Sequence, residues 1–186
     1  PDWMLGLQNN FSYKGISLGF LFDYRHGGIV VSRTKTIGST SGQLAETLLG
    51  RENGYDLTQP GNGIISEGVI RNADGSFTPN TIKITSRNWH NRYYERNNVE
   101  AAKYDATFLK LREVTIGYTI PKSILGKMPI QDVKISLVAR NLALWTENPH
   151  FDPETMAMGG GTLIPGVEDM AFPSTRNIGF NLNVKF

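Results

Sequence analysis

The sequence predicts an all-β protein built from antiparallel strands. Several segments of about ten residues alternate apolar and polar side chains, which is the period of a strand with one apolar face. The connections between these segments are alternately short and long, as in a transmembrane β-barrel. The 20 glycines and 9 prolines indicate many turns. Spacing alone leaves a membrane barrel and a soluble β-sandwich or lectin equally open.

The composition excludes several other classes of protein. The net charge of +2 is too near neutral for a nucleic-acid binder held by phosphate contacts. The chain has no cysteine, so disulfides, zinc–thiolate sites and cysteine nucleophiles are absent. The sequence contains no run of about 18 apolar residues, so it predicts no transmembrane helix. A transmembrane strand needs only about 9–11 alternating residues.

The first two strands are expected at about 3–13 and 16–25, joined by the two-residue turn Lys14-Gly15. In the second strand the apolar and polar side chains fall on opposite faces. On the barrel interpretation the apolar side chains meet lipid and the polar ones face the lumen. The apolar set is Ile16, Leu18, Phe20 and Phe22, and the polar set is Ser17, Gly19 and Asp23.

The alternation mostly fails over residues 26–103, which is far longer than an ordinary connection. We expect a folded excursion with a small helix near 41–49 and short strands near 82–85. Strand character returns at 104–120, where the phase slips near Arg112-Glu113, and a β-bulge would explain the slip.

A short helical turn is expected after Pro121, ending at Gly126. The fourth strand follows at 133–145, and a second long loop at 146–175 contains the glycine run 159–161. The last strand, at 176–186, has the cleanest alternation. Aromatic residues near the strand ends fit the interfacial girdles of a membrane barrel. They are Trp3, Tyr13, Tyr24, Tyr118, Trp145 and Phe186.

A series of motifs runs through most of the chain. In order and spacing, they resemble the C-terminal region of SusC/RagA-type TonB-linked outer-membrane transporters. The motifs are KLREV at 110–114, GYTIP at 117–121, ARNL at 139–142, DPE at 152–154, PSTR at 173–176 and GFNLNVKF at 179–186.

The resemblance implies that residues 1–186 are the C-terminal part of one TonB-dependent β-barrel domain of the 22-stranded, plugged type. The loops at about 26–103 and 146–175 would then be extracellular. Five strands cannot close such a barrel, so the first strand needs the remainder of the barrel to cover its edge.

The resemblance also implies a function. The parent protein would lie in the outer membrane of a Gram-negative bacterium, in contact with its lipid, and import a bulky oligosaccharide or oligopeptide. A SusD-like surface lipoprotein would hold the solute, and the TonB complex would act on a plug outside this chain. The alternative function is a soluble all-β carbohydrate-binding module.

The run 89–96 mixes aromatic and basic residues. Trp89, Tyr93 and Tyr94 are therefore the candidate substrate-binding residues, for a glycan or a peptide. The same rings could simply pack the long loop against its neighbours. Stacking on nucleic-acid bases is disfavoured by the balanced charge.

No motif indicates an enzyme, a cofactor or a histidine metal site. His26, His90 and His150 are far apart and lack ligand spacing. Asp152-Pro153-Glu154 could offer oxygens to Ca²⁺, although a turn with capping carboxylates is the favoured interpretation.

The last strand is the candidate assembly signal. Resemblance to outer-membrane proteins implies that the assembly machinery recognises a terminal aromatic strand. The residues concerned are Ile178, Phe180, Leu182, Val184 and Phe186.

Overall fold

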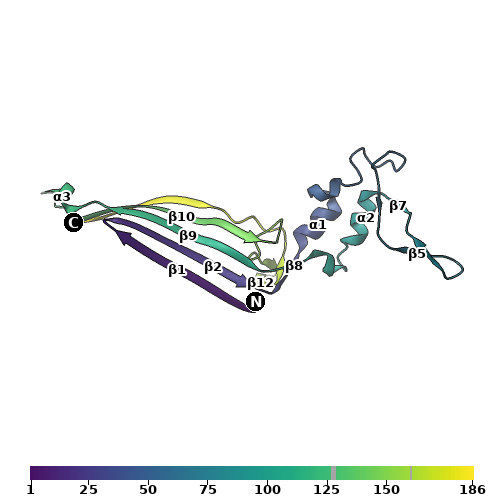
Figure 1. Ribbon diagram of the computed structural model, residues 1–186, viewed down its shortest axis with the longest axis horizontal. Helices are drawn as coiled ribbons and strands as arrows, with labels where there is room; N and C mark the ends of the chain where they lie inside the picture. Colours follow the sequence, from purple (N-terminus) through teal and green to yellow (C-terminus); the bar gives the residue numbers. More distant parts are fainter. Residues whose placement is uncertain (127–128, 160) are drawn as a thin grey trace.

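The computed structural model describes residues 1–126, 129–159 and 161–186. It consists of one long antiparallel sheet with a smaller helical lobe beyond one end (Figure 1). The sheet order β1-β2-β9-β10-β14 follows the chain, so each long strand pairs with the next one. The all-β prediction is confirmed. The strands are β1 (Trp3–Tyr13), β2 (Ile16–His26), β9 (Phe108–Thr119), β10 (Asp132–Thr146) and β14 (Asn177–Lys185).

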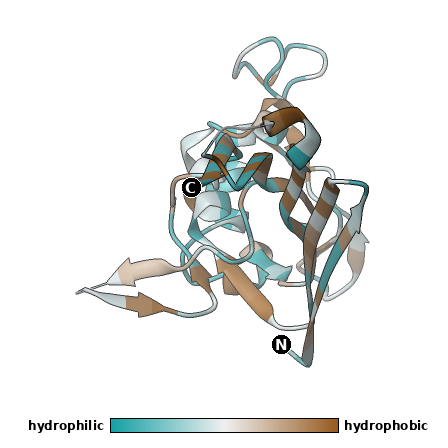
Figure 2. Cartoon of the chain, turned by 90° about the vertical axis from the view of Figure 1, so that its left-hand side faces the viewer, coloured by the Kyte–Doolittle hydropathy of each residue, from teal (hydrophilic) through white to brown (hydrophobic). Residues whose placement is uncertain are grey.

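The pairing register gives the sheet one apolar face. Leu18 lies between Phe11 of β1 and Ile116 of β9, whereas its neighbour Ser17 lies between Ser12 and Gly117. The apolar face continues across β10 and β14, where Leu137 lies opposite Phe180. Seen from the turn end of the sheet, the strands show alternating hydrophobic and hydrophilic bands (Figure 2). The expected division of β2 between two faces is confirmed.

The turns at one end of the sheet follow from local sequence. Lys14 and Gly15 both have positive φ, 46° and 86°, as a two-residue type I′ hairpin requires. The expected helical turn is α3 (Lys122–Leu125), and its cap is Gly126. The remainder of this connection includes residues 127 and 128, which lie outside the described residues.

The predicted β-bulge is present. Glu113 pairs with Leu21 and Leu111 pairs with Phe22, so Arg112 is an extra residue opposite β2. The register with β10 also shifts there, and Asn141 takes a positive φ of 52°. Strict alternation would turn one of two adjacent charged residues toward the apolar face. The bulge lets both Arg112 and Glu113 avoid that face.

Both long excursions leave the sheet at the end opposite to α3 (Figure 1). The lobe comes mostly from the first excursion. Its elements are β3 (Ile29–Ser32), α1 (Arg33–Ser41), the 3₁₀ helix η1 (Ala45–Leu48), β4 (Ile64–Ile65), β5 (Val69–Arg71), β6 (Phe77–Pro79), β7 (Lys83–Ile84), α2 (Ser86–Tyr93), the 3₁₀ helix η2 (Val99–Ala102) and β8 (Lys103–Asp105).

The second excursion forms a hairpin and one further short strand. The hairpin strands are β11 (Ala157–Gly159) and β12 (Thr162–Ile164), and β13 (Val167–Glu168) pairs in parallel with β3. The glycine run expected here includes residue 160, which lies outside the described residues.

The small helix expected near 41–49 corresponds to η1 at Ala45–Leu48, and α1 just before it was not expected. The structure places α1 at Arg33–Ser41 because Ser32 caps its first turn and Gly42, at φ 74°, ends it. Only η1 lies within the expected range, and α2 was not expected at all. The short strand expected near 82–85 corresponds to β7.

The strand expected over 104–120 is two strands. Residues 103–105 form β8, which pairs with β3 in the lobe, and β9 begins at Phe108. A tight turn separates them, because the Asp105 carboxylate accepts a hydrogen bond of 2.6 Å from the backbone N–H of Thr107. The side chain of Thr107 also accepts a hydrogen bond from the N–H of Gly27. This bond connects the residue after β2 to the residue before β9.

Candidate functional site

The three aromatic residues predicted to bind substrate do not form one platform. Trp89 and Tyr93 stack on one side of α2, with ring centroids 5.0 Å apart and planes at 12°. They line a shallow hollow of about 230 Å³ with Arg92 and Asn98. Tyr94, at the C-terminal cap of α2, stacks on His90 instead and lies beneath the Lys35 ammonium group.

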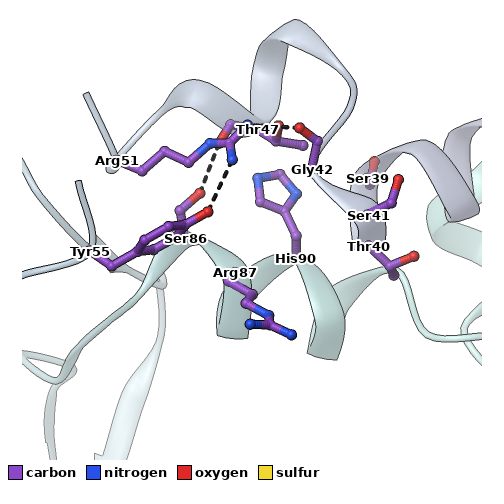
Figure 3. Close-up of a pocket in the computed structure, with 10 residues that line it drawn as sticks. All are labelled: Ser39, Thr40, Ser41, Gly42, Thr47, Arg51, Tyr55, Ser86, Arg87 and His90. Carbon is purple, nitrogen blue, oxygen red and sulfur yellow. Dashed lines mark hydrogen bonds between the residues drawn. The ribbon is translucent and has the colours of Figure 1, made fainter. Parts of the chain in front are cut away.

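A second cavity, of about 270 Å³, lies between α1, η1 and α2 (Figure 3). Its lining is polar and includes no carboxylate. Arg51 is held in place at this cavity by neutral oxygen atoms: it donates to the carbonyl of Gly42 at 2.7 Å, to Thr47 at 2.9 Å and to the Tyr55 hydroxyl at 3.1 Å. The full lining is Ser39, Thr40, Ser41, Gly42, Thr47, Arg51, Tyr55, Ser86, Arg87 and His90.

His90 projects from α2 into the space between Arg51 and Ser41 (Figure 3). The residue is only 5% exposed, yet within the described part of the chain neither ring nitrogen has a hydrogen-bond partner. Burial lowers the pKa of His90, and the positive charges of Lys35 and Arg51 lower it further against the opposing effect of Glu46. The imidazole is therefore held neutral in this lobe at ordinary pH.

Behind the cavity, Lys35 of α1 forms a salt bridge with Glu46. Burial opposes the charge of each group and is the largest single effect, but the hydrogen bond between them and the nearby charges together outweigh it. The pKa of Lys35 is raised and that of Glu46 is lowered. The Glu46 carboxylate also accepts from Ser39, so its charge is already compensated on the helix side of the cavity.

A cluster of charges fixes the second excursion to the polar face of the sheet. Lys110 Nζ lies 2.6 Å from Asp152 and 2.5 Å from Glu154. Arg112, the bulge residue, bridges Glu154 and Asp23 of β2 at 2.5 and 2.6 Å. Lys110 and Asp152 are almost completely buried, which makes this a strong anchor only while it is fully paired.

The arrangement corrects the idea of a calcium site at Asp152-Pro153-Glu154. Both carboxylates are occupied by Lys110 and Arg112. Burial would raise the pKa of Asp152, but hydrogen bonds from Lys110 and from the backbone N–H of Glu154 outweigh it and lower the pKa. The turn interpretation is supported, because Asp152 also accepts at its carbonyl from Thr155.

Glu168 ties the two excursions together. Its carboxylate is fully buried and accepts from the hydroxyls of Ser32 and Thr34 at 2.7 and 2.5 Å. Ser32 is also the N-cap of α1, so the negative charge lies at the positive end of that helix. This contact joins residues 136 positions apart in sequence.

The residues proposed as an assembly signal all lie on β14 or directly after it. Ile178, Phe180 and Leu182 face the same side as Ala139, Leu137 and Ile135 of β10. The rings of Phe180 and Phe186 are 78% and 80% exposed. β14 pairs with β10, and its other edge has no partner among the described residues.

Sequence reasoning missed Arg51, Arg87 and the serines of α1 as cavity residues. The one available signal was Arg51 following Gly50, which has positive φ and lies against the backbone of Gly63. Nothing in the spacing of residues 39 and 86 indicates that they meet at one cavity. His90 was considered only as a metal ligand, and no metal-binding group of three or more His, Asp or Glu occurs in the described ranges.

The chain is 25% identical to TonB-dependent receptor P3 of Formosa agariphila, over all of its own length and 16% of that protein. It is 25% identical to TonB-dependent receptor P26 of the same organism, again over its whole length and 17% of that protein. These relatives match the SusC/RagA-type resemblance. The chain thus spans about a sixth of the curated relatives it matches.

The fold is also similar to that of solved structures of the RagAB peptide importer. The RagAB peptide importer in its open-open state superimposes with a TM-score of 0.62 at 18% identity, covering 98% of this chain and 17% of that one. Its closed-closed state gives 0.57 at 19% identity, covering 95% and 16%. No protein-family model matches the sequence. Among the described residues, no helix combines the length and apolar character needed to cross a membrane.

Proposed function

We propose that this chain is the C-terminal wall of an outer-membrane TonB-dependent transporter of the SusC/RagA type. The observation that carries the proposal is the apolar face of the five-stranded sheet. Many large apolar side chains along it are exposed, including Leu5 at 56%, Leu137 at 52% and Phe180 at 78%. A continuous apolar surface of this size suits lipid and is unsuited to water.

The height of this face supports the membrane assignment. Trp3 and Tyr13 lie at opposite ends of β1, ten residues apart. At about 3.3 Å per residue and a tilt of about 40°, they would be separated by about 25 Å, the height of a barrel's apolar band. Trp3 packs on Tyr24 at 5.0 Å, and Tyr118 lies beside Ile16 and so near Tyr13 at the other end. These rings would form the two girdles.

The two sheet edges indicate the need for more strands. In the described residues, β1 pairs only with β2 and β14 only with β10. Open edges cannot face lipid, so the remaining strands of a 22-stranded type barrel would cover them. The polar face, with Ser17, Gly19 and Asp23, would then line the lumen and meet the plug.

The lobe and the second excursion would be extracellular, because both leave the same end of the sheet. There they would meet a SusD-like lipoprotein and an incoming oligosaccharide or oligopeptide. Trp89 and Tyr93 remain the proposed contact residues for that solute, since their stacked pair is partly exposed. Tyr94 is a packing residue. The same apolar face disfavours the soluble carbohydrate-binding module.

The orientation can be tested with an epitope tag inserted between Asp74 and Gly75 in the full-length protein. These residues form the exposed turn between β5 and β6. Antibody should label the tag on intact cells, and a matched tag at Lys14-Gly15 should be labelled only after the outer membrane is broken. The reverse pattern would overturn the topology. Recovery of the protein from the aqueous fraction without detergent would favour the soluble module.

A further inference from the structure

The cavity at His90 has the chemistry of a binding site that the transport proposal does not assign. Two guanidinium groups, an imidazole and several hydroxyls converge on it, and no carboxylate lines it. The salt bridges of the described residues include neither Arg51 nor Arg87. Arg51 is half-buried and His90 is buried, and such polar groups are normally paired, so their unpartnered nitrogens indicate a missing partner.

Three buried nitrogen atoms at the cavity have no hydrogen-bond partner among the described residues. The Nε of Arg51 is buried without a partner, although the terminal nitrogens of the same guanidinium are bonded. Both nitrogens of His90 are also buried without a partner, in a residue that is 95% shielded from solvent and aimed into the cavity (Figure 3). An oxygen-rich ligand would satisfy the histidine and the charge of the arginines together.

We infer that this cavity binds a carboxylate-bearing unit of the incoming solute. The guanidinium group of Arg87 matches the planar, two-oxygen geometry of a carboxylate, and Nε of Arg51 adds one further donor. The hydroxyls of Ser39, Ser41 and Ser86 line the same cavity and suit the polar remainder of such a unit. The volume of about 270 Å³ lies at the lower end of small-molecule sites, so it holds one acidic sugar or one acidic side chain rather than an oligomer.

This inference rests on the proposed uptake function, because it assigns the cavity to the solute that reaches the lobe. Binding can nevertheless be measured apart from transport. The full-length transporter, purified in detergent from the outer membrane, is titrated calorimetrically with two acidic probes and their neutral counterparts. The probes are a galacturonic acid trimer against a galactose trimer, and Ala-Glu-Ala against Ala-Gln-Ala.

We expect one acidic probe to bind at least about tenfold more tightly than its neutral counterpart, and which one binds identifies the source of the carboxylate. Arg51→Gln and Arg87→Gln should each abolish most of that preference. Arg87 is exposed and makes no hydrogen bond within the described residues, so its substitution leaves the lobe folded. The control Arg71→Gln removes an exposed arginine on β5, outside the cavity, and should change nothing.

Equal binding of acidic and neutral probes would overturn the inference, as would unchanged binding by the Arg87 variant. Failure of both acidic probes to bind would overturn it as well. If the protein still fractionates with the outer membrane and labels on intact cells, only the site fails and the transport proposal stands. If it does not, the transport proposal fails independently of the titration.

Discussion

The sheet and the lobe are stabilised by different means. The sheet turns an apolar face outward and is held by long, regular strand pairing. The lobe contains few buried apolar side chains, and its interior is rich in hydrogen-bonded polar groups. Those groups include Ser32, Lys35, Ser39, Thr47, Asn62, Ser86 and Glu168, against buried apolar residues such as Val30, Ala102 and Ala106.

On the proposed function, the difference teaches how one chain can serve two environments. A sheet that faced lipid would gain nothing from hiding apolar side chains inside itself, so its strand pairing would have to stabilise the structure. A small excursion in water has too little apolar surface for a large core, so it depends on satisfied polar networks. The charge cluster at Lys110 joins the sheet to the second excursion, and substitutions there should have the largest effect.

Replacing Lys110 by methionine should release the second excursion from the sheet. The change leaves Asp152 buried and unpaired, which costs about 3–5 kcal/mol for a broken buried pair. Hydrogen exchange across residues 146–175 should rise strongly in the variant. Arg140→Met is the matched control, since its salt bridge to Glu113 is exposed and should be worth under about 1 kcal/mol. Equal effects of the two changes would show that burial of the pair does not matter.

An arginine on the apolar face of the sheet should be the next most harmful change. Phe20→Arg places a charge near the middle of the apolar band, opposite Asn9 of β1 and Val114 of β9, and should lower the free energy of unfolding in lipid by about 2–4 kcal/mol. Gln8→Arg, on the polar face of β1, should cost much less. Urea unfolding of the full-length barrel in lipid vesicles compares the two. A similar loss for both variants would argue that neither face meets lipid.

Phe186 is expected to matter for assembly rather than for the lobe. It continues the apolar face of β14 toward the end of the sheet where Tyr13 and Tyr118 lie. Phe186→Asp in the full-length protein should lower its abundance in purified outer membranes severalfold. Asn183→Asp, which alters the polar face of the same strand, is the control. Wild-type levels of the Phe186 variant would remove this residue from the proposed signal.

The smallest effect should come from acidification of the lobe. The pKa of His90 is lowered by burial, so His90 binds a proton more weakly in the folded lobe than in the unfolded lobe. The lobe should therefore lose stability as the pH falls below the ordinary histidine value of about 6.5, and no such penalty applies above it. Hydrogen exchange of residues 86–94 at pH 7.5 and 5.5 measures the loss.

His90→Asn should flatten that pH dependence, while His26→Asn, at an exposed position beside the sheet, should leave it intact. If the wild-type lobe exchanges equally at both pH values, its histidine is more accessible to water than the structure indicates.

The lobe shows most clearly where sequence reasoning ended. The helix α1 was not expected, because residues 33–41 carry no apolar stripe. Its position depends on Glu168, which bonds Ser32 from the other excursion. The cavity also depends on contacts between distant residues, since His90 and Arg51 come from separate segments that meet only in the folded lobe. Local patterns do not encode such contacts.

The sequence by itself determined the strands of the sheet, the Lys14-Gly15 turn, the bulge at Arg112 and the resemblance to SusC/RagA-type transporters. Each of these depends on the period of two or on short motifs, and both are local properties of the chain. Only the tertiary structure decided that Lys110 and Arg112 hold Asp152 and Glu154, and that Tyr94 stacks on His90 and meets Trp89 only edge-on. Those outcomes depend on which charges and rings meet across long separations, where burial makes an unpaired polar group too costly to leave unsatisfied.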